Sequence, residues 1–481
     1  MSQQKFIDRE EEMEILKNQY DMEGSGLIVI YGRRRVGKTE LINNFMSGHG
    51  LYFLATNEGD TENIRNFQKL LSEFLNDKSI EYAYYNDWYS LFSSIVNNKN
   101  FIEKTKKSKI IIAIDEFPYL IGANRSIPSI FQKIYDSFLK NNNIFLILSG
   151  SSVSIMENDV LSYKSPLYGR RTGQIRIKPL KFKFINNFLK YNIEDLCNSY
   201  FVLGGIPEYI LKFNTNLSFW NNLKNNFLNR GSYLYEEAEF LLRGELREAR
   251  NYFTILKAIA IGNHRLNEIC SYTGMDKSMV SKYIDVLISL DFIEPEIPFG
   301  SDKNFKRRLY WIKDNYLSFW FRYILPNKSE IENSRTERVF NYIKNDFNTY
   351  AGEKFEYLIR SLIYDGLTGK YYDNVSRWWG KNKLKNKGND IEEIDIVAYS
   401  SERNELLFGE CKWTNKKISA SLIDKLMEKS KILLKNYNNC NVIYALFSKS
   451  GFIENKNTIK NKNIILMDLN DVKNFIEKNK S

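Results

Sequence analysis

The 481-residue sequence has few of the side chains that build metal or disulfide frameworks. Its two histidines are His49 and His264, and none of its four cysteines lies at metal-ligand spacing from another: Cys197, Cys270, Cys411 and Cys440. A structural zinc site needs four closely spaced cysteine or histidine ligands, so the sequence argues against one. Scattered cysteines are typical of reduced thiols in a cytoplasmic protein.

Long apolar runs are also absent. A membrane-spanning helix needs about 20 consecutive apolar residues, whereas the most apolar stretch, 316–325, is short and contains Arg322. Residues 1–14 are polar and acidic, which is unlike a secretory signal. We therefore expect a soluble, cytoplasmic protein with no membrane partner.

Aromatic and basic side chains are abundant. Hydrophobic residues make up 43% and aromatic residues 15% of the chain, enough to fill the cores of the roughly two to four domains expected at this length. The formal net charge of +11 permits a nucleic-acid partner. Heavy use of Lys, Asn and Ile throughout the chain also fits a biased nucleotide composition, so the charge alone does not indicate DNA binding.

Short apolar strands alternate with helical stretches over residues 1–178. The strands are expected at 27–32, 51–56, 109–117, 144–152 and 174–180. This alternation predicts βαβ units and a mainly parallel sheet.

A glycine-rich loop, GRRRVGKT, follows the first strand and precedes a helix. This G-x-x-x-x-G-K-T pattern allows backbone N–H groups to surround phosphate oxygens at a helix N-terminus. Lys38 would reach the β- and γ-phosphates of ATP and Thr39 would ligate Mg²⁺. The predicted nucleotide-binding residues are Gly32, Arg33, Arg34, Arg35, Val36, Gly37, Lys38, Thr39 and Glu40.

Acidic and hydroxyl side chains end two later strands. In IIIAIDEF, Asp115 would support Mg²⁺, and Glu116 is the expected base for the attacking water. In LILSGSS, Ser149 or Ser151 would sense the γ-phosphate. Arg170 and Arg171, in SPLYGRRTGQ, would stabilise charge on the phosphoryl group or pair with surface acids, and both alternatives stay open.

Taken in order, FIDREEE, GRRRVGKTELI, IIIAIDEFPYL, LILSGSS, SPLYGRRTGQIRIKPL and GGIPEYI resemble the motifs of archaeal-type ATPases, relatives of the AAA+ and STAND switches. The resemblance covers about the first 210 residues. It implies that Arg9 and Glu10 lie near the nucleotide base, and that the turn at 204–207 closes a helical lid over it.

Residues 265–295 read as a helix, a Thr-Gly turn and a second helix, for which Asp276 is the expected N-cap. Two apolar segments then fit a wing, with Lys303, Lys306, Arg307 and Arg308 on or near it. This predicts a winged helix-turn-helix. Its partner is double-stranded DNA, or it is a packing module that contacts protein alone.

The segment EEIDIVAYSSERNELLFGECKW reads as a β-hairpin. A turn between Glu402 and Arg403 would place Asp395 opposite Glu410, with Lys412 on the same face as Glu410. Facing carboxylates repel each other unless a cation such as Mg²⁺ lies between them. Lys412 would then orient the attacking water, and Glu356 would be a third acid.

The order of helix, strand, hairpin, helix and strand over 350–470, with FE, ID and GECKW, resembles the PD-(D/E)xK nuclease core of DUF234-type proteins. Ile394 stands where the motif has Pro. The domain would be an active deoxyribonuclease or an inactive relic. Lysines at 381, 383, 385 and 387 would follow a DNA backbone or form a solvated loop.

Together these motifs predict a multidomain α/β protein with ATP and Mg²⁺ as cofactors and homo-oligomers as a possible assembly. Its domains would be a P-loop NTPase core (1–178), a helical lid (179–248), a winged helix (249–326) and a restriction-endonuclease-like α/β domain (345–481). The expected function is an ATPase switch controlling a Mg²⁺-dependent DNA nuclease. The alternatives are a nucleotide-dependent DNA-binding regulator and a signalling scaffold.

Overall fold

A computed structural model describes residues 7–246, 249–302, 305, 307–381, 391–437, 439–454 and 463–479. The chain forms two compact units. The first comprises residues 1–180 with 206–208, and the second comprises 181–205 with 209–481. The first boundary lies two residues beyond the expected end of the ATPase core, and the second unit contains most of the other three expected domains.

The first unit is built on a five-stranded sheet in the order β2-β3-β4-β1-β5. All of its pairings are parallel, as the βαβ alternation predicts. All five expected strands form, most of them slightly shorter than expected: β1 (Gly26–Tyr31), β2 (Leu51–Leu54), β3 (Ile110–Asp115), β4 (Ile144–Gly150) and β5 (Gly173–Arg176).

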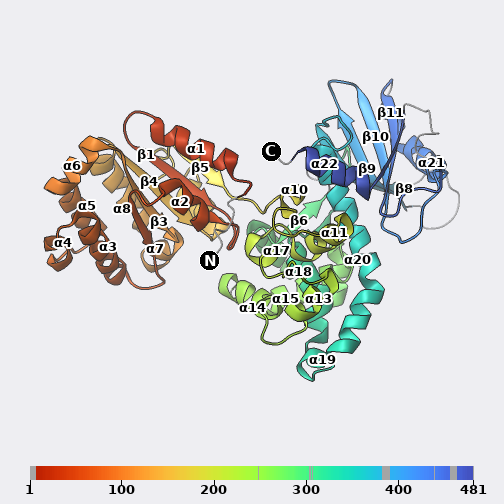
Figure 1. Cartoon of the computed structure of the whole chain (residues 1–481), viewed down its shortest axis with the longest axis horizontal. Coiled ribbons are helices and arrows are strands. Elements are labelled where there is room, and N and C mark those ends of the chain that lie inside the picture. Colours follow the sequence, from red (N-terminus) through yellow and green to blue (C-terminus); the bar gives the residue numbers. More distant parts are fainter. Residues whose placement is uncertain are drawn as a thin grey trace. The chain divides into compact units, whose positions relative to one another are not determined.

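Helices cover both faces of this sheet (Figure 1). Helices α3, α5, α7 and α8 pack together on one face, and α1 and α2 lie on the other. The helical elements are α1 (Glu10–Asp21), α2 (Lys38–Met46), α3 (Asp60–Leu75), α4 (Ser79–Tyr82), α5 (Trp88–Val96), α6 (Lys99–Lys107), α7 (Phe117–Ala123), α8 (Ile127–Ile134), η1 (Tyr135–Leu139), α9 (Val153–Ile155) and η2 (Met156–Leu161).

The strand order brings three distant segments to one edge of the sheet. The phosphate loop follows β1, Asp115 ends β3, and Ser149 lies near the end of β4, which separates those two strands. Ligands of open α/β sheets bind at this carboxyl edge. Because β5 runs parallel to β1, the start of β5 lies at the opposite, amino-terminal ends of the strands.

The second unit begins with helices, as expected for 179–248. They are α10 (Phe182–Ile185), α11 (Ile193–Leu203), α13 (Phe219–Phe227) and α14 (Tyr233–Glu245), and α12 (Pro207–Ile210) begins in the first unit and ends in the second. The apolar stretch at 316–325 forms α18 (Asn315–Phe319) and η3 (Trp320–Ile324) and is almost wholly buried. Buried aromatic side chains join these segments, and Tyr350 donates a hydrogen bond to the Phe201 carbonyl at 2.7 Å.

The described residues of 249–312 form helices α15 (Ala249–Ala260), α16 (Leu266–Thr273) and α17 (Lys277–Ser289) and the paired strands β6 (Ile293–Glu296) and β7 (Leu309–Ile312). Asp276 caps α17 by accepting a hydrogen bond from the Met279 N–H at 2.9 Å, which confirms its predicted role. Lys303 and Lys306 lie outside the described residues.

A continuous 29-residue helix, α20 (Thr336–Tyr364), leads into the C-terminal sheet. It follows η4 (Leu325–Asn327) and α19 (Lys328–Glu332), so most of the expected linker is helical. The sheet has the order β12-β11-β10-β9-β8, with antiparallel pairing from β8 to β10 and parallel pairing from β10 to β12. Helix α21 packs on one side of it and α20 on the other (Figure 1).

The strands of this sheet are β8 (Asn374–Lys381), β9 (Ile391–Ser400), β10 (Glu405–Lys412), β11 (Asn441–Ser448) and β12 (Ile464–Asp468). Its helices after β10 are α21 (Leu422–Leu434) and α22 (Leu469–Lys478). The sequence predicted the order up to β11. The predicted lysines at 383, 385 and 387 lie outside the described residues.

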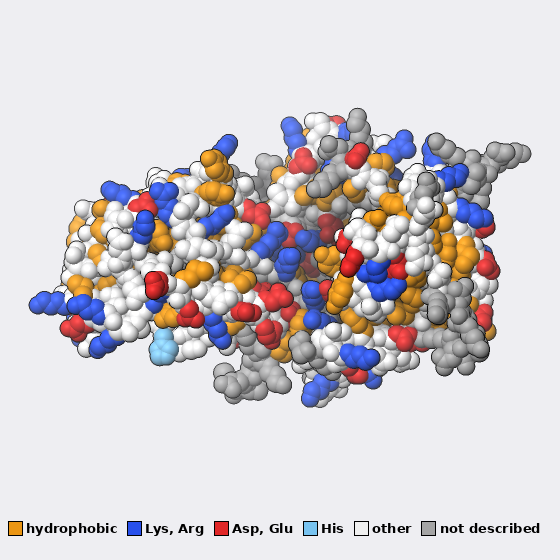
Figure 2. All heavy atoms as spheres, turned by 90° about the horizontal axis from the view of Figure 1, so that it is seen from above, with side chains coloured by type: hydrophobic (Ala, Val, Ile, Leu, Met, Phe, Trp, Pro, Cys, Tyr) orange, Lys and Arg blue, Asp and Glu red, His pale blue; other side chains and the backbone are white. Residues whose placement is uncertain are grey.

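Acidic and basic side chains are interspersed among the described residues on the molecular face drawn in Figure 2. Within the described ranges, no helix is long and apolar enough to cross a membrane.

Candidate functional site

The phosphate loop depends on backbone conformations that favour glycine. Gly32 has φ +154°, and a Cβ atom there would lie 2.3 Å from the Ile177 carbonyl oxygen. Gly37, the residue before α2, has φ +97°. Any side chain at Gly32 would thus collide with the backbone of the segment after β5, which explains the first glycine of the motif.

Lys38 folds back over the loop that it follows. Its Nζ donates hydrogen bonds to the carbonyl oxygens of Gly32 and Arg33, each at 3.0 Å. The side chain is buried. The ammonium group is thus already inside the loop that would receive a phosphate.

Asp115 is held at the end of β3 by two hydroxyl groups. Thr39 Oγ1 donates to Asp115 Oδ2 at 2.7 Å, and Tyr52 Oη donates to the same oxygen at 2.8 Å. Burial, with Asp115 as the next contribution, raises the pKa of Tyr52 well above its usual value, so the phenol stays a donor. The sequence did not single out Tyr52, because strand order alone brings β2 beside β3.

Glu116 lies directly after this strand in a left-handed conformation, φ +55°. Its Oε2 accepts a hydrogen bond from Ser151 Oγ at 2.7 Å, so the carboxylate is directed toward the end of β4. Ser149 Oγ, in the same region, is buried and has no hydrogen-bond partner among the described residues. A non-glycine residue in this conformation is typical of functional sites.

Arg9 links the backbone of the phosphate loop to the segment after β5. Its guanidinium group donates to the carbonyl oxygens of Val36 and Lys178 at 3.0 and 2.8 Å. Arg34 contacts Tyr119 at 3.4 Å, and Glu40 accepts a hydrogen bond from Asn44. Since Arg9 binds the loop backbone, it fixes the loop conformation, and its proposed position near the base stays a prediction.

Arg170 and Arg171 lie away from this chain's own phosphate loop. Arg170 pairs with Asp136 at 2.9 Å, and Arg171 donates to the Leu161 carbonyl at 3.0 Å. The next residue, Thr172, bonds the Leu27 carbonyl at the start of β1, whereas the loop follows the end of β1. The two arginines therefore do not join the site formed by Lys38 and Asp115.

These residues fit a nucleotide with Mg²⁺. The loop offers backbone N–H groups and an ammonium group, and Thr39 with Asp115 is the hydroxyl and carboxylate pair that holds Mg²⁺ in P-loop proteins. The orphaned Ser149 hydroxyl provides a further donor at the same edge.

The second candidate site lies at a register shift in the C-terminal sheet. Between the pairs Ser376–Val397 and Trp378–Ile394, Arg377 alone faces two residues of β9, Asp395 and Ile396. Such bulges redirect side chains and occur often beside active sites. Here the bulge turns Asp395 so that its Oδ2 accepts the Cys411 backbone N–H at 2.9 Å.

The β9–β10 register is the one expected from a turn between Glu402 and Arg403. The last recorded pair is Gly409 with Ile396, and Glu410 and Asp395 are the next residues. Glu410 carries two ion pairs, with Lys412 at 2.7 Å and with Lys429 of α21 at 3.2 Å. Lys429 was not predicted, since the sequence does not show that α21 crosses this face.

Asp395 interacts electrostatically with acids on both of its sides. Burial and then the Glu410 charge raise the pKa of Asp395. Burial and then the Asp395 charge raise the pKa of Glu356, on α20, to about 8. Burial alone would lower the pKa of Lys412, but its hydrogen bond to Glu410 and the charges of Glu410 and Asp395 together raise it.

The donor set at Asp395 and Glu410 fits a divalent cation in its chemistry. Two mutually destabilising carboxylates are what Mg²⁺ neutralises, with water completing its shell. In the described ranges, however, no three His, Cys, Asp or Glu side chains are close enough together to hold one metal ion. Glu356 would therefore act beside the metal and not as a ligand.

Comparisons with known proteins match both parts of the chain. Residues 6–213 match the family described as an ATPase domain predominantly from Archaea. Residues 320–423 match DUF234, described as archaeal and bacterial proteins of unknown function. An uncharacterized protein of Methanocaldococcus jannaschii, MJECL04, is 39% identical over 97% of this chain and 99% of its own length.

A solved structure shares the fold. The Walker-type ATPase PABY2304 of Pyrococcus abyssi aligns with a TM-score of 0.50 and 24% identity, over 66% of this chain and 96% of that one. The parallel-sheet unit thus has the fold of a P-loop ATPase, and the second unit carries the C-terminal mixed sheet.

Proposed function

Because the chain belongs to the archaeal ATPase family in which a DUF234 domain follows the ATPase domain, we propose that it is an ATP-hydrolysing switch that controls DNA cleavage at its C-terminal sheet. The ATPase half is supported by the contact of Thr39 with Asp115 beside the buried Lys38. The nuclease half is supported by one observation, the meeting of Asp395, Glu410 and Lys412 on the β9–β10 hairpin.

In the ATPase step, Lys38 exchanges its bonds to the loop carbonyls for bonds to the β- and γ-phosphates. Glu116 accepts a proton from the attacking water, and its hydrogen bond with Ser151 fixes the carboxylate at the strand end. Bound Mg²⁺ supplies charge neutralisation between the phosphates. Arg170 and Arg171 serve this step only if a second copy of the chain presents them.

In the cleavage step, Lys412 leaves Glu410 and donates to a phosphodiester oxygen, and Asp395 and Glu410 would hold Mg²⁺. The ion would supply a bound water of lowered pKa, and attack of that water on the phosphorus atom would break the P–O bond to one strand end, whose oxygen takes up a proton. Asp395 keeps its orientation through the Cys411 N–H. Glu356, with its raised pKa, is placed to take or return a proton at this site.

Helices α16 and α17 with strands β6 and β7 form the proposed winged helix. Lys277, Ser278 and Lys282 are exposed on α17, and this face would enter the major groove of duplex DNA. The buried face, Val280, Ile284 and Leu287, packs into the unit.

Plasmid nicking tests the proposal directly. Wild type, Lys412→Ala and Lys38→Ala are incubated with supercoiled DNA, Mg²⁺ and ATP. Wild type is expected to nick the DNA, Lys412→Ala to lose at least about 100-fold in rate, and Lys38→Ala to lose the dependence on ATP. Lys473→Ala, at an exposed position of α22 in the same unit, is the control.

A wild type that never cuts, or a Lys412→Ala variant that cuts equally well, would overturn the nuclease half. ATP hydrolysis is measured on the same samples. It reports on the first unit independently of DNA cleavage.

A nucleotide-dependent DNA-binding regulator is the second candidate. The two lysines on Glu410 and the absence of a three-ligand group among the described residues favour it, because both are compatible with a site that never loads metal. It predicts duplex DNA binding that weakens steeply with salt and is indifferent to Asp395→Ala. Replacing Lys277 and Lys282 with Ala would reduce the salt slope by about 2.

A further inference from the structure

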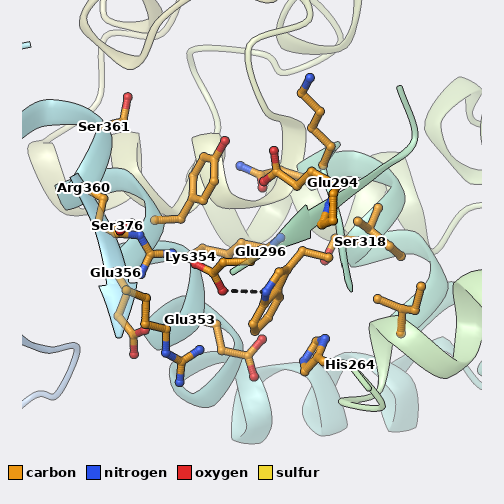
Figure 3. Close-up of a pocket in the computed structure, with 18 of the residues that line it drawn as sticks. His264, Glu294, Glu296, Ser318, Glu353, Lys354, Glu356, Arg360, Ser361 and Ser376 are labelled. Carbon is orange, nitrogen blue, oxygen red and sulfur yellow. Dashed lines mark hydrogen bonds and ion pairs between the residues drawn. The ribbon is translucent and has the colours of Figure 1, made fainter. Parts of the chain in front are cut away.

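A cavity of about 480 Å³ lies within the second unit, between the β6–β7 pair, helix α20 and strand β8. This volume falls within the range of roughly 300–1,000 Å³ found for small-ligand pockets. Glu356 lines it, so the cavity reaches the residue that interacts with Asp395. Figure 3 shows the side chains of Glu296, Glu353 and His264 among those that line the cavity.

One side of the cavity is aromatic. His264 and Trp311 both line it and stack on each other, with ring centroids 3.7 Å apart and planes 28° apart. Trp311 Nε1 donates to Glu296 at 2.8 Å, and His264 Nδ1 contacts the Tyr310 carbonyl at 3.0 Å. Both rings are thus held in place and offer a platform for a planar ligand.

The opposite side carries cationic and hydroxyl groups with unmet hydrogen-bonding capacity. Arg377 Nη2 pairs with Glu393 at 2.5 Å, but Arg377 Nε and Ser376 Oγ are buried and have no hydrogen-bond partner in the part of the chain that the structure describes. They are consecutive residues of β8, where Ser376 pairs with Val397 and Arg377 faces Asp395 and Ile396 at the β9 bulge, and both line the cavity. Two adjacent donors left without an acceptor point to an anionic group such as phosphate.

The carboxylates of Glu294 and Glu353 also line the cavity. Burial raises the pKa values of Glu294 and Glu353, and it lowers the pKa of Lys354 to about 8. Carboxylates of this kind accept hydrogen bonds from exocyclic amino groups of bases, as Glu does from cytosine N4. The cavity thus presents a stacking surface, acceptors for a base edge and donors for an anion.

We propose that this cavity binds one nucleotide unit, with its phosphate at Ser376 and Arg377 and its base toward His264 and Trp311. The unit is either a free nucleoside monophosphate or an unpaired nucleotide of a DNA strand. In the second case it is the nucleotide beside the cut, and that assignment rests on the proposed nuclease function. Binding itself requires no cleavage.

The cavity also connects to the Asp395 site through Arg360. This residue donates to the Asp395 backbone carbonyl at 3.0 Å and pairs with Glu296 at 3.4 Å. Glu296 is in turn the acceptor for Trp311. A base seated against Trp311 therefore contacts a chain of bonded side chains that ends at the β9 bulge.

Calorimetric titration of the full chain tests the proposal, in a Lys38→Ala background that removes binding at the phosphate loop and with EDTA to prevent cleavage. The probes are dCMP, dTMP and a short single-stranded oligonucleotide. At least one probe is expected to bind, with dCMP tighter than dTMP. Trp311→Leu should weaken binding about tenfold, through lost stacking.

A second variant, at an exposed position, is needed because Trp311→Leu could lose binding through misfolding. Ser361→Trp places a large side chain at an exposed position on the cavity rim, and it should weaken binding at least about tenfold by blocking entry. Asn345→Trp, at an exposed position on the same helix outside the cavity, is the matched control and should bind like its parent. Equal binding by Ser361→Trp and Asn345→Trp, or no binding of any probe, overturns the proposal.

The probes also separate the two sources of the ligand. Tighter binding of the oligonucleotide supports a strand nucleotide, and equal or tighter binding of dCMP supports a free mononucleotide. If plasmid nicking fails while the titration succeeds, the cavity assignment holds and the nuclease function falls. If nicking succeeds while the titration fails, the cavity assignment falls alone.

Discussion

The carboxylates of the two candidate sites have different kinds of partner. In the first unit, Asp115 accepts hydrogen bonds from two neutral hydroxyl groups, while the lysine of the phosphate loop donates to the carbonyl of Gly32. In the second, Asp395 and Glu410 lie beside each other, and two ammonium groups neutralise Glu410. The nucleotide site is thus arranged for its ligand in advance, whereas the acidic site is occupied by its own lysines.

This difference suggests that the two sites respond differently to ligands. The first site needs only local rearrangement of Lys38, because Thr39 and Asp115 already meet. The second must release Glu410 from Lys412 and Lys429 before a cation binds. A requirement of this kind suits a site that is controlled from elsewhere in the chain.

The largest expected effect is at the first site. Lys38→Ala should reduce ATP hydrolysis at least about 100-fold, because the ammonium group stabilises charge that develops on the transferred phosphate. Phosphate release under saturating ATP measures this. Lys69→Ala, at an exposed position of α3, is the control, and an unchanged rate in Lys38→Ala would show that the loop does not support hydrolysis.

The next largest effect is expected in mild acid, which should lower the free energy of unfolding of the second unit through His264. Burial lowers the pKa of His264 to about 4 from its usual 6.5, so the unfolded chain binds this proton more readily than the folded one. The stabilisation is complete above pH 6.5 and is lost as the pH falls toward 4, by roughly 1–3 kcal/mol. Denaturant unfolding of His264→Phe should lack this pH dependence.

His49→Phe provides the control, since His49 is exposed on the first unit. Its unfolding should follow the wild-type pH profile. A His264→Phe variant with that same profile would assign the acid sensitivity to other groups.

A smaller effect is expected from neutralising Asp395. Asp395→Asn keeps an acceptor for the Cys411 N–H and removes the repulsion from Glu410, so in EDTA it should stabilise the second unit by about 0.2–1 kcal/mol. Mg²⁺ should stabilise the wild type and leave this variant unchanged. Thermal unfolding with and without Mg²⁺ measures both, in a Lys38→Ala background. If Mg²⁺ stabilised both proteins equally, Asp395 would not be a ligand of the ion.

The smallest effect concerns Tyr52. Tyr52→Phe removes one of the two hydroxyl groups on Asp115, a bond with a net value of about 1 kcal/mol, so kcat for ATP hydrolysis should fall about fivefold. Tyr119→Phe, which loses the longer contact with Arg34, should change kcat less. Equal losses in both variants would contradict a specific role for Tyr52.

The sequence predicted the features that depend on local pattern. Apolar strands with a Gly-Lys-Thr loop predicted the parallel sheet and its carboxyl edge, and the turn at Glu402–Arg403 predicted the β9–β10 register. In both cases a short segment determines the geometry, because strand period and turn position fix which residues face each other.

Features that depend on packing between distant segments were not predictable. The order of strands brings Tyr52 to Asp115, and the crossing of α21 brings Lys429 to Glu410. The start of β5 places Arg170 and Arg171 at the edge opposite the phosphate loop. The bulge at Asp395 depends on the pairing of β8 with β9, and the cavity forms between the β6–β7 pair, α20 and β8. Because each feature needs segments that are distant in the chain, no single stretch of sequence predicts it.

Anomalous scattering from a crystal of the full chain grown with Mn²⁺ and an ATP analogue tests the central claim most directly. The account predicts two manganese peaks, one at Thr39 and Asp115 and the other between Asp395 and Glu410, with Lys412 moved off the Glu410 carboxylate. A peak at the first site, with Glu410 still bound by both lysines and no peak beside it, would contradict the claim that the second site is a metal-dependent nuclease.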